Sequence, residues 1–299
     1  MFFLKYLVVL IFILLGVAFF TLFERKILGY GHNRFGPNKV GIWGIFQPFT
    51  DAIKLFSKED LNQMQIRLFI YNISPILGLL IRLFLWVIIG FWGLLFFSNF
   101  SFVLFICLSS MGVYVLLLRG WSTRTKYSLL GRYRSSAQSI SYEVIIILCF
   151  LIVVYTWWNI NLIWSFLFQG GLSLGFLYII VFFFWLVSCV AETNRSPFDF
   201  SEGESELVSG FNTEYGGGLF SLIFIGEYSS IIFLSILRSL LFFNFKFFLI
   251  VSFFLCFYYL WVRCSFPRMR YDILIVISWK GFSLGAIAFL LVFFYFFVN

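Results

Sequence analysis

The chain has 299 residues, of which 62% are hydrophobic and 11% are charged, and its formal net charge is +8. So apolar a composition excludes a soluble globular domain and is typical of a polytopic α-helical membrane protein. A membrane β-barrel is excluded as well, because its strands would alternate apolar and polar residues and the long runs of this chain do not.

Apolar runs of about 20 residues are long enough to cross a bilayer as helices. Eight such runs predict an all-α fold with a single transmembrane domain over residues 1–299. They lie at 2–23, 68–97, 101–118, 137–158, 172–191, 217–237, 245–262 and 274–298. The first run follows Lys5 and has no A-x-A-like cleavage site. We therefore expect it to be a retained helix rather than a signal or transit peptide.

The polar segments between these runs predict the orientation of the chain. With eight spans, four segments share one side of the membrane and both termini share the other; the segments are 24–67, 119–136, 192–215 and 263–272. They hold 16 of the 21 lysines and arginines, against Lys5, Arg238 and Lys246 on the opposite side. The positive-inside rule then places the four segments in the matrix or cytoplasm and both termini outside.

The first polar segment contains an amphipathic pattern. Pro48 is well placed to start a short helix. Apolar residues recur around it at helical spacing, namely Phe46, Phe49, Ile53 and Phe56. This pattern predicts a helix lying in the membrane interface. Such a helix could form one wall of an opening for a lipid-soluble substrate, or it could be a mere amphipathic connector.

Three glutamates lie in or beside predicted spans: Glu143, Glu192 and Glu227. A charge at the bilayer centre costs about 2.5–3.5 kcal/mol on insertion scales, so ionisable residues there are functional candidates, most commonly as proton relays. The alternative is a structural carboxylate neutralised by one arginine, such as Arg82 in the second span.

The polar segments differ sharply in charge. The segment 192–215 carries six carboxylates and one arginine, and Glu202, Glu204 and Glu206 are close enough to repel one another. Such groups resist full ionisation, which suits them to take up and release protons. The segment 119–136 has five positive charges and no negative charge. It could bind anionic lipid head groups, pair with the acidic segment or dock a soluble partner.

Residue patterns that bind redox cofactors or metals are sparse. The five cysteines form no C-x-x-C pair, which indicates buried free thiols rather than ligands of an iron–sulfur cluster. The single histidine, His32, cannot supply the paired axial ligands of a membrane haem b. We therefore expect this chain to bind no cofactor and no metal by itself.

Five stretches of the sequence, in order along the chain, carry a family resemblance. They are Glu-Arg-Lys at 24–26, Arg-Phe-Gly-Pro-Asn-Lys-Val-Gly at 34–41, Gln-Pro-Phe-Thr-Asp-Ala-Ile-Lys-Leu-Phe at 47–56, Ala-Gln-Ser-Ile-Ser-Tyr-Glu at 137–143 and the long, specific block at 191–215. Together they resemble the chain-1 family of NADH–ubiquinone oxidoreductases, the heel subunit of respiratory complex I. Arg82, two serines at 135 and 136, and the lack of a proline after Trp279-Lys280 depart from the family pattern.

The resemblance implies a non-redox subunit of a proton-translocating NADH:ubiquinone oxidoreductase, with ubiquinone as substrate and with FMN and iron–sulfur clusters in partner subunits. It implies a quinone entrance and tunnel at Glu24, Arg25, Arg34, Phe46, Phe49 and Asp51. It also implies a proton relay made of Glu143, Glu192, Asp199, Glu202, Glu204, Glu206 and Glu227. The relay would lead from the quinone site to proton-pumping subunits.

The resemblance also implies partners and a location. The expected partners are soluble quinone-site and iron–sulfur subunits, antiporter-like membrane subunits, ubiquinone and phospholipids, but not nucleic acid. The expected location is the mitochondrial inner membrane, with the polar segments in the matrix and both termini on the intermembrane side.

Two other functions stay open from the sequence. One is the membrane anchor of an energy-converting hydrogenase, which would not need a hydrophobic tunnel for a long isoprenoid. The other is an autonomous ion or solute carrier. Against a carrier stand the absence of an obvious internal repeat and the concentration of charge on one face.

Overall fold

The computed structural model describes residues 2–59, 67–89, 100–157, 173–199, 215–244 and 247–298. Within these ranges every regular element is helical, which confirms the all-α fold class. The elements are α1 (Phe2–Gly31), η1 (Ile42–Gly44), α2 (Gln47–Phe56), α3 (Leu68–Ile88), α4 (Ser101–Thr123), α5 (Lys126–Trp157), α7 (Leu174–Leu177), α8 (Ile179–Glu192), α10 (Gly217–Phe242), α11 (Phe248–Ser265), α12 (Tyr271–Val276), η4 (Ile277–Phe282) and α13 (Ser283–Val298).

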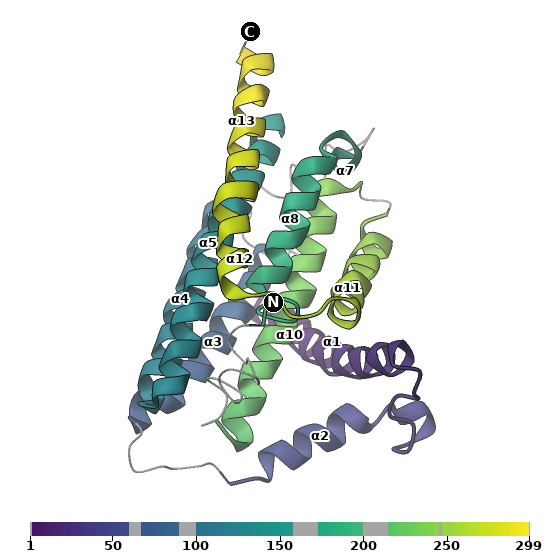
Figure 1. Ribbon diagram of the computed structural model, residues 1–299. Helices are drawn as coiled ribbons and strands as arrows, with labels where there is room; N and C mark the ends of the chain where they lie inside the picture. Colours follow the sequence, from purple (N-terminus) through teal and green to yellow (C-terminus); the bar gives the residue numbers. More distant parts are fainter. Residues whose placement is uncertain are drawn as a thin grey trace.

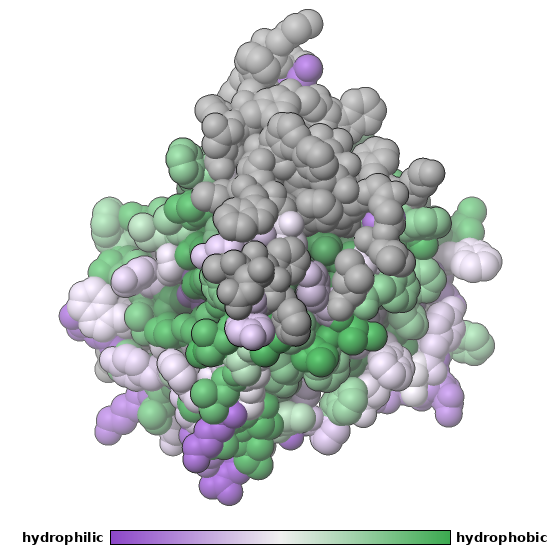
Figure 2. Space-filling model, turned by 90° about the horizontal axis from the view of Figure 1, so that it is seen from above, coloured by the Kyte–Doolittle hydropathy of each residue, from purple (hydrophilic) through white to green (hydrophobic). Residues whose placement is uncertain are grey.

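Seven helices of the described part are long and apolar enough to cross a membrane. They are Lys5–Gly31, Leu68–Ile88, Ser101–Thr123, Lys126–Thr156, Gly217–Phe242, Phe248–Ser265 and Tyr271–Tyr295, and the shorter Ile179–Glu192 is apolar as well. The last long span joins α12, η4 and α13 without a break. Hydrophobic residues also cover much of the described surface that is visible in Figure 2. The chain is therefore a polytopic membrane protein.

Two of the segments expected as loops are largely helical. α1 continues to Gly31, so Glu24 and Arg25 lie on a helix. In the segment 119–136 only Arg124 and Thr125 interrupt the helices, and Arg124 adopts the left-handed conformation with φ 56°. The link joins α4 directly to α5, and these two helices pack against each other. The side of the membrane that each segment faces stays a prediction.

Helix α10 lies at the centre of the arrangement. In Figure 1, helices α3, α4 and α5 gather on one side of it and α1, α2 and α11 on the other. α10 packs against α3, α11, α1 and α2, whereas α8 and α13 pack against α5. Aromatic rings fill the space between α5, α8 and α10: the ring of Trp185 lies 5.1 Å from that of Phe150 and 5.4 Å from that of Phe242.

The position of Arg238 corrects the predicted end of the span 217–237. We expected this arginine in a loop on the side of the termini, but it lies inside α10 and is fully buried. Its Nη2 donates a hydrogen bond to the hydroxyl of Tyr259 on α11, at 3.0 Å. The helix continues past Arg238 because the residues that follow, Leu241 and Phe242 among them, are apolar and buried in the core. A single charge within an apolar run thus did not end the helix.

Candidate functional site

Glu143 of α5 faces α4 inside the bundle. Ser109 of α4 donates a hydrogen bond from its hydroxyl to Oε1 of Glu143, at 2.9 Å. This hydrogen bond fixes the direction of the Glu143 carboxyl group. Glu143 is thereby aimed at the space between the helices.

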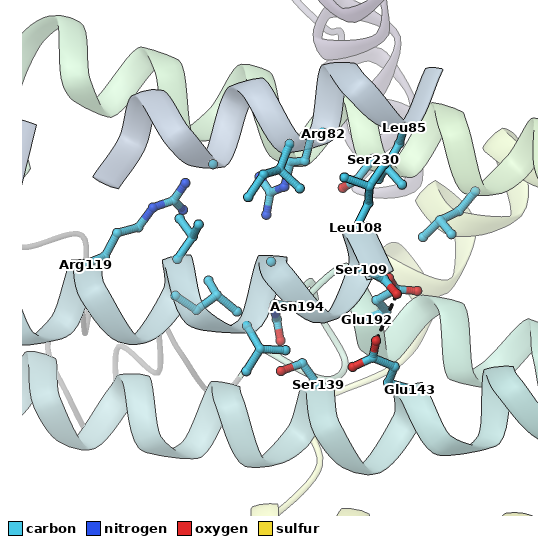
Figure 3. Close-up of a pocket in the computed structure, with 17 residues that line it drawn as sticks. Arg82, Leu85, Leu108, Ser109, Arg119, Ser139, Glu143, Glu192, Asn194 and Ser230 are labelled. Carbon is cyan, nitrogen blue, oxygen red and sulfur yellow. Dashed lines mark hydrogen bonds between the residues drawn. The ribbon is translucent and has the colours of Figure 1, made fainter. Parts of the chain in front are cut away.

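A cavity of about 80 Å³ lies between α3, α4, α5, α8 and α10. Its polar lining includes Arg82, Arg119, Glu143, Glu192 and Asn194. Figure 3 shows Glu143 and Glu192 with Ser109 at one end and Arg119 at the other, with Arg82 and Asn194 between them. Since one water needs about 10–15 Å³ of such space, the cavity can hold several water molecules. The two glutamates expected at separate spans therefore share one site.

Several polar atoms at this cavity have no direct hydrogen-bond partner within the described residues. They are Oε2 of Glu192, Nε and Nη1 of Arg119, and Oδ1 of Asn194, all of them buried. Buried polar groups are stabilised only when they are hydrogen-bonded, to protein or to water. Donors and acceptors thus face the same enclosed space, which is the arrangement that ordered water can bridge.

Two glycines make room for the two arginines of the cavity. Gly78 of α3 lies against Arg119, and a Cβ atom at position 78 would overlap Nη2 of that side chain. Gly226 of α10 lies against Arg82, and a Cβ atom there would lie 2.9 Å from Nη1. Each guanidinium therefore crosses the face of a neighbouring helix where that helix has no side chain. Arg119, which we expected at a membrane-side loop, therefore belongs to the site, and no sequence pattern indicated this.

Glu227 of α10 forms a buried ion pair. Nη2 of Arg195 lies 2.8 Å from Oε2 of Glu227, and both side chains are about nine-tenths buried. The guanidinium carbon of Arg195 also lies 4.9 Å from the ring centres of Phe224 and Tyr228. An arginine thus neutralises Glu227, as one of our two sequence interpretations allowed. The partner is Arg195, which follows Glu192 by three residues, and not Arg82.

Gln138 holds the turn that carries Arg195. Its Nε2 donates to the carbonyl of Ala191 at 2.9 Å and to the carbonyl of Phe198 at 2.9 Å, and the side chain is fully buried. These two carbonyls lie on either side of the turn after α8. One amide from α5 therefore pins both ends of the stretch that carries Glu192 and Arg195. Sequence reasoning missed this residue, although it stands in the stretch 137–143 that carried the family resemblance.

Asp199 lies at the far end of the same turn and does not line the cavity. Its Oδ2 is 3.4 Å from Nη2 of Arg268, which lies between α11 and α12. The amide of Met269 donates to the carbonyl of Pro197, at 3.1 Å. The turn is thus also attached to the α11–α12 connection. Glu202, Glu204 and Glu206, predicted to continue the relay, lie outside the described residues.

The residues predicted for a quinone entrance fall into two groups. Arg25 of α1 pairs with Asp51 of α2, and Gln47 donates from Nε2 to Oδ1 of Asp51 at 3.0 Å. Phe49 meets Phe19 of α1 edge to face, with 6.2 Å between ring centres. These contacts fix α2 against the end of α1. Phe46 and Phe49 are exposed, as an interfacial helix requires.

Glu24 and Arg34 take other positions. Glu24 is buried and pairs with Arg263 of α11, so it joins α1 to α11. Arg34 is exposed in the turn after α1, where its amide donates to the carbonyl of Gly29 at 2.9 Å. The structure therefore brings Arg25, Asp51 and Phe49 together and places Glu24 in a separate helix contact.

Within the described residues, no group of three or more histidine, cysteine, aspartate or glutamate side chains could hold a metal ion. All five cysteines are free, and Cys149 and Cys189 are buried. The carboxylates of this cavity are groups that can bind and release protons, and buried guanidinium groups lie beside them.

Comparisons with known proteins give a consistent result. A family described as NADH dehydrogenase matches residues 4–294. NADH-ubiquinone oxidoreductase chain 1 of Aedes aegypti is 45% identical over 285 residues, covering 92% of this chain and 90% of the relative. The protein of that name from Locusta migratoria is 46% identical, with 94% and 91% covered. The one from Rhipicephalus sanguineus is 41% identical, with 99% and 95% covered.

Proposed function

The chain belongs to the family of NADH-ubiquinone oxidoreductase chain 1, a membrane subunit of respiratory complex I, and on this premise we propose that it links ubiquinone reduction to proton movement. Two parts of the molecule would share this work. One is an entrance for ubiquinone at α1 and α2. The other is a proton relay between α3, α4, α5, α8 and α10.

The observation that carries the relay is the shared cavity. Glu143 and Glu192 come from different helices, yet both line one space with Arg82 and Arg119. In an apolar environment a proton moves readily between carboxylates that water connects, and a fixed positive charge decides which of them is ionised. The unsatisfied oxygen of Glu192 faces this space, so Glu192 is suited to exchange a proton with its surroundings.

Glu227 would be the next proton site. Its charge is balanced by Arg195, and Arg195 lies on the turn that begins directly after Glu192. Protonation of Glu227 would weaken this pair and free the guanidinium to act on another carboxylate. A movement of the turn after α8, which carries Arg195, would therefore alter the charge at Glu192 and at Glu227 together. Asp199, Glu202, Glu204 and Glu206 would extend the relay along the same segment.

The entrance rests on the contacts of α2. This helix packs against α1 and α10, and exposed aromatic side chains of Phe46, Phe49 and Phe56 lie along it. An amphipathic helix at the membrane interface, held beside a span by the Arg25–Asp51 pair, can border an opening through which a lipid-soluble quinone passes. Glu24 and Arg34 would line the quinone tunnel, deeper inside it or at its margin.

In this proposal the protein works as one of several subunits in the mitochondrial inner membrane. Soluble partners would hold FMN and the iron–sulfur clusters, and antiporter-like membrane partners would carry protons across. The polar segments would face the matrix, where the soluble partners bind.

A substitution of Glu227 tests the relay. Glu227→Gln keeps the shape and a hydrogen-bonding group but removes the proton that titrates. We expect an assembled complex that loses most ubiquinone reduction and proton pumping, while electron transfer from NADH to an artificial acceptor upstream of the quinone persists. Normal activity and normal proton yield in a fully assembled Glu227→Gln complex would refute a relay role for this residue.

A photoreactive ubiquinone analogue tests the entrance independently. Labelling is expected within residues 46–56 or at the end of α1 near Arg25. Labelling confined to residues 159–171, which we predict on the opposite side of the membrane, would contradict the entrance. That result would leave the relay untouched, because the two sites use different residues.

A further inference from the structure

Lys280 is an exposed charge within an apolar transmembrane span. It belongs to η4, nine residues after the start of the span Tyr271–Tyr295, and its side chain is exposed. Within the described residues, no hydrogen bond or ion pair holds its ammonium group. At a rise of 1.5 Å per residue, Lys280 lies about 14 Å along the span from its first residue.

An unpaired ammonium at this depth is costly when it faces lipid. Insertion scales give about 2.5–3.5 kcal/mol for a lysine at a helix centre, and such residues normally face a partner or water. A lysine can reduce this cost by snorkelling, that is, by reaching along its own side chain to the nearest interface. The residues around Lys280 distinguish a polar partner from snorkelling.

The surface around Lys280 has the form of a helix-packing face. Exposed residues follow one another along it at spacings of three or four, and all but the lysine are apolar: Val276, Lys280, Leu284, Ile287 and Leu291. Gly281 is exposed beside Lys280, and a Cβ atom there would meet only Ile277 of its own helix, at 4.0 Å. Small residues let helices approach closely in membranes, where association depends on packing and polar contacts.

The local backbone supports the same conclusion. Residues Ile277–Phe282 form a π-helical turn, and such turns insert an extra residue that widens the helix. Ser278, two residues before Lys280, is buried, so the side of the helix opposite Lys280 is already packed within the chain. The turn thus presents Lys280 and Gly281 outward. Figure 1 shows the span at the outside of the bundle, beside α5.

We propose that the face formed by Val276, Lys280, Gly281, Leu284, Ile287 and Leu291 is an interface with a transmembrane helix of another complex I subunit. That helix would carry an aspartate or glutamate opposite Lys280, because a carboxylate at this depth compensates the ammonium and needs compensation itself. The proposal requires only membership of the complex. It does not depend on the relay or on the quinone entrance.

Zero-length cross-linking of the intact complex tests the proposal. A lipid-soluble carbodiimide activates carboxylates within the membrane, and a neighbouring lysine then forms an amide with loss of the urea. Mass spectrometry should find the peptide of Lys280 joined to an acidic residue in a transmembrane helix of a different subunit. Recovery of Lys280 free of any such link would overturn the proposal.

Subunit content of the complex provides the second measurement. With Lys280→Met, we expect at least about tenfold less of one membrane subunit to stay bound after mild detergent extraction, since truncating one partner of a buried charge pair costs more than a factor of ten. Lys280→Arg should retain that subunit. Lys5→Met, at an exposed lysine near the start of α1, is the matched control and should retain it too.

Two outcomes would decide against the interface. A Lys280→Met complex with unchanged subunit content would show that no partner depends on the charge. Loss of a bound phospholipid with every subunit retained would assign Lys280 to a snorkelled lipid contact. If Lys280→Met prevents the chain from accumulating, the cross-link in the unmodified complex decides alone.

Discussion

Two buried arginines, Arg195 packed against α10 and Arg238 within it, differ in what faces them. Arg195 meets the carboxylate of Glu227 and two aromatic rings. Arg238 meets the hydroxyl and ring of Tyr259, with its guanidinium carbon 5.5 Å from the ring centre. In the described part of the chain no carboxylate pairs with Arg238. One arginine therefore belongs to a pair that a proton can break, whereas the other rests against a neutral group.

The difference separates a switchable charge from a fixed one. A proton added to Glu227 removes the negative half of its pair and changes the field around Arg195. At Arg238 no carboxylate is available for such an event within the described residues, because its partners there are the hydroxyl of Tyr259 and the thiol of Cys189. We infer that the Arg195 region responds to the state of the relay and that Arg238 mainly supports the packing of α10 against α11.

The largest effect is expected for Arg195→Met. The substitution leaves the carboxylate of Glu227 buried and uncompensated, and breaking a buried pair in this way costs about 3–5 kcal/mol. We expect little assembled complex on native gels and almost no ubiquinone reduction. The double variant Arg195→Met/Glu227→Gln should recover assembly, since no charge is left unpaired, but not proton pumping. Normal assembly of the Arg195→Met complex would show that Arg195 and Arg238 do not differ in this way.

A smaller effect is expected for Gln138→Met, which removes the donor to the carbonyls of Ala191 and Phe198. Leaving a buried acceptor unsatisfied costs about 1–3 kcal/mol. We expect a lower melting temperature of the complex and slower ubiquinone reduction, because the turn no longer holds Arg195 against Glu227. Ser141→Ala is the matched control, since within the described residues the hydroxyl of Ser141 bonds only to its own helix, at the carbonyl of Gln138.

Gln138→Glu distinguishes positioning from mere packing. An ionised glutamate cannot donate a hydrogen bond to a carbonyl, whereas a protonated one can donate a single bond. Activity of this variant should therefore recover partly as the pH falls, relative to the unmodified complex at the same pH. A pH profile parallel to that of Gln138→Met would argue against the positioning role.

The smallest effects are expected at Arg238. Tyr259→Phe removes one acceptor and should cost about 1 kcal/mol of stability, with ubiquinone reduction close to normal. Arg238→Met should be nearly neutral or stabilising, because replacing a buried charge by a well-packed apolar side chain often is. Thermal denaturation of the purified complex measures both. A loss of proton pumping in Arg238→Met would show that this arginine also acts on the relay.

Hydropathy and spacing predicted the fold class and most of the transmembrane helices, because the cost of exposing polar backbone to lipid leaves few alternatives. The same reasoning found Glu143, Glu192 and Glu227, since a carboxylate within an apolar run stands out in any sequence. The amphipathic spacing around Phe49 likewise predicted α2.

Pairings between distant residues could not be predicted in this way. Glu24 pairs with Arg263, and Glu227 pairs with Arg195 rather than Arg82. These choices depend on which helices are neighbours and on how each is rotated, and one sequence does not contain that information. Gln138 was missed for the same reason, because an amide on a helix looks ordinary until its two acceptors are known.

The two glycines that make room for buried arginines have a consequence for inherited variation. Gly78 and Gly226 carry no charge, yet each makes the space that a buried guanidinium occupies. A Gly78→Ala substitution adds one methyl group, but that methyl would displace the positive end of Arg119. Its phenotype should therefore resemble the loss of a charge in the cavity rather than a packing defect. A variant at such a glycine is best interpreted together with the arginine that it accommodates.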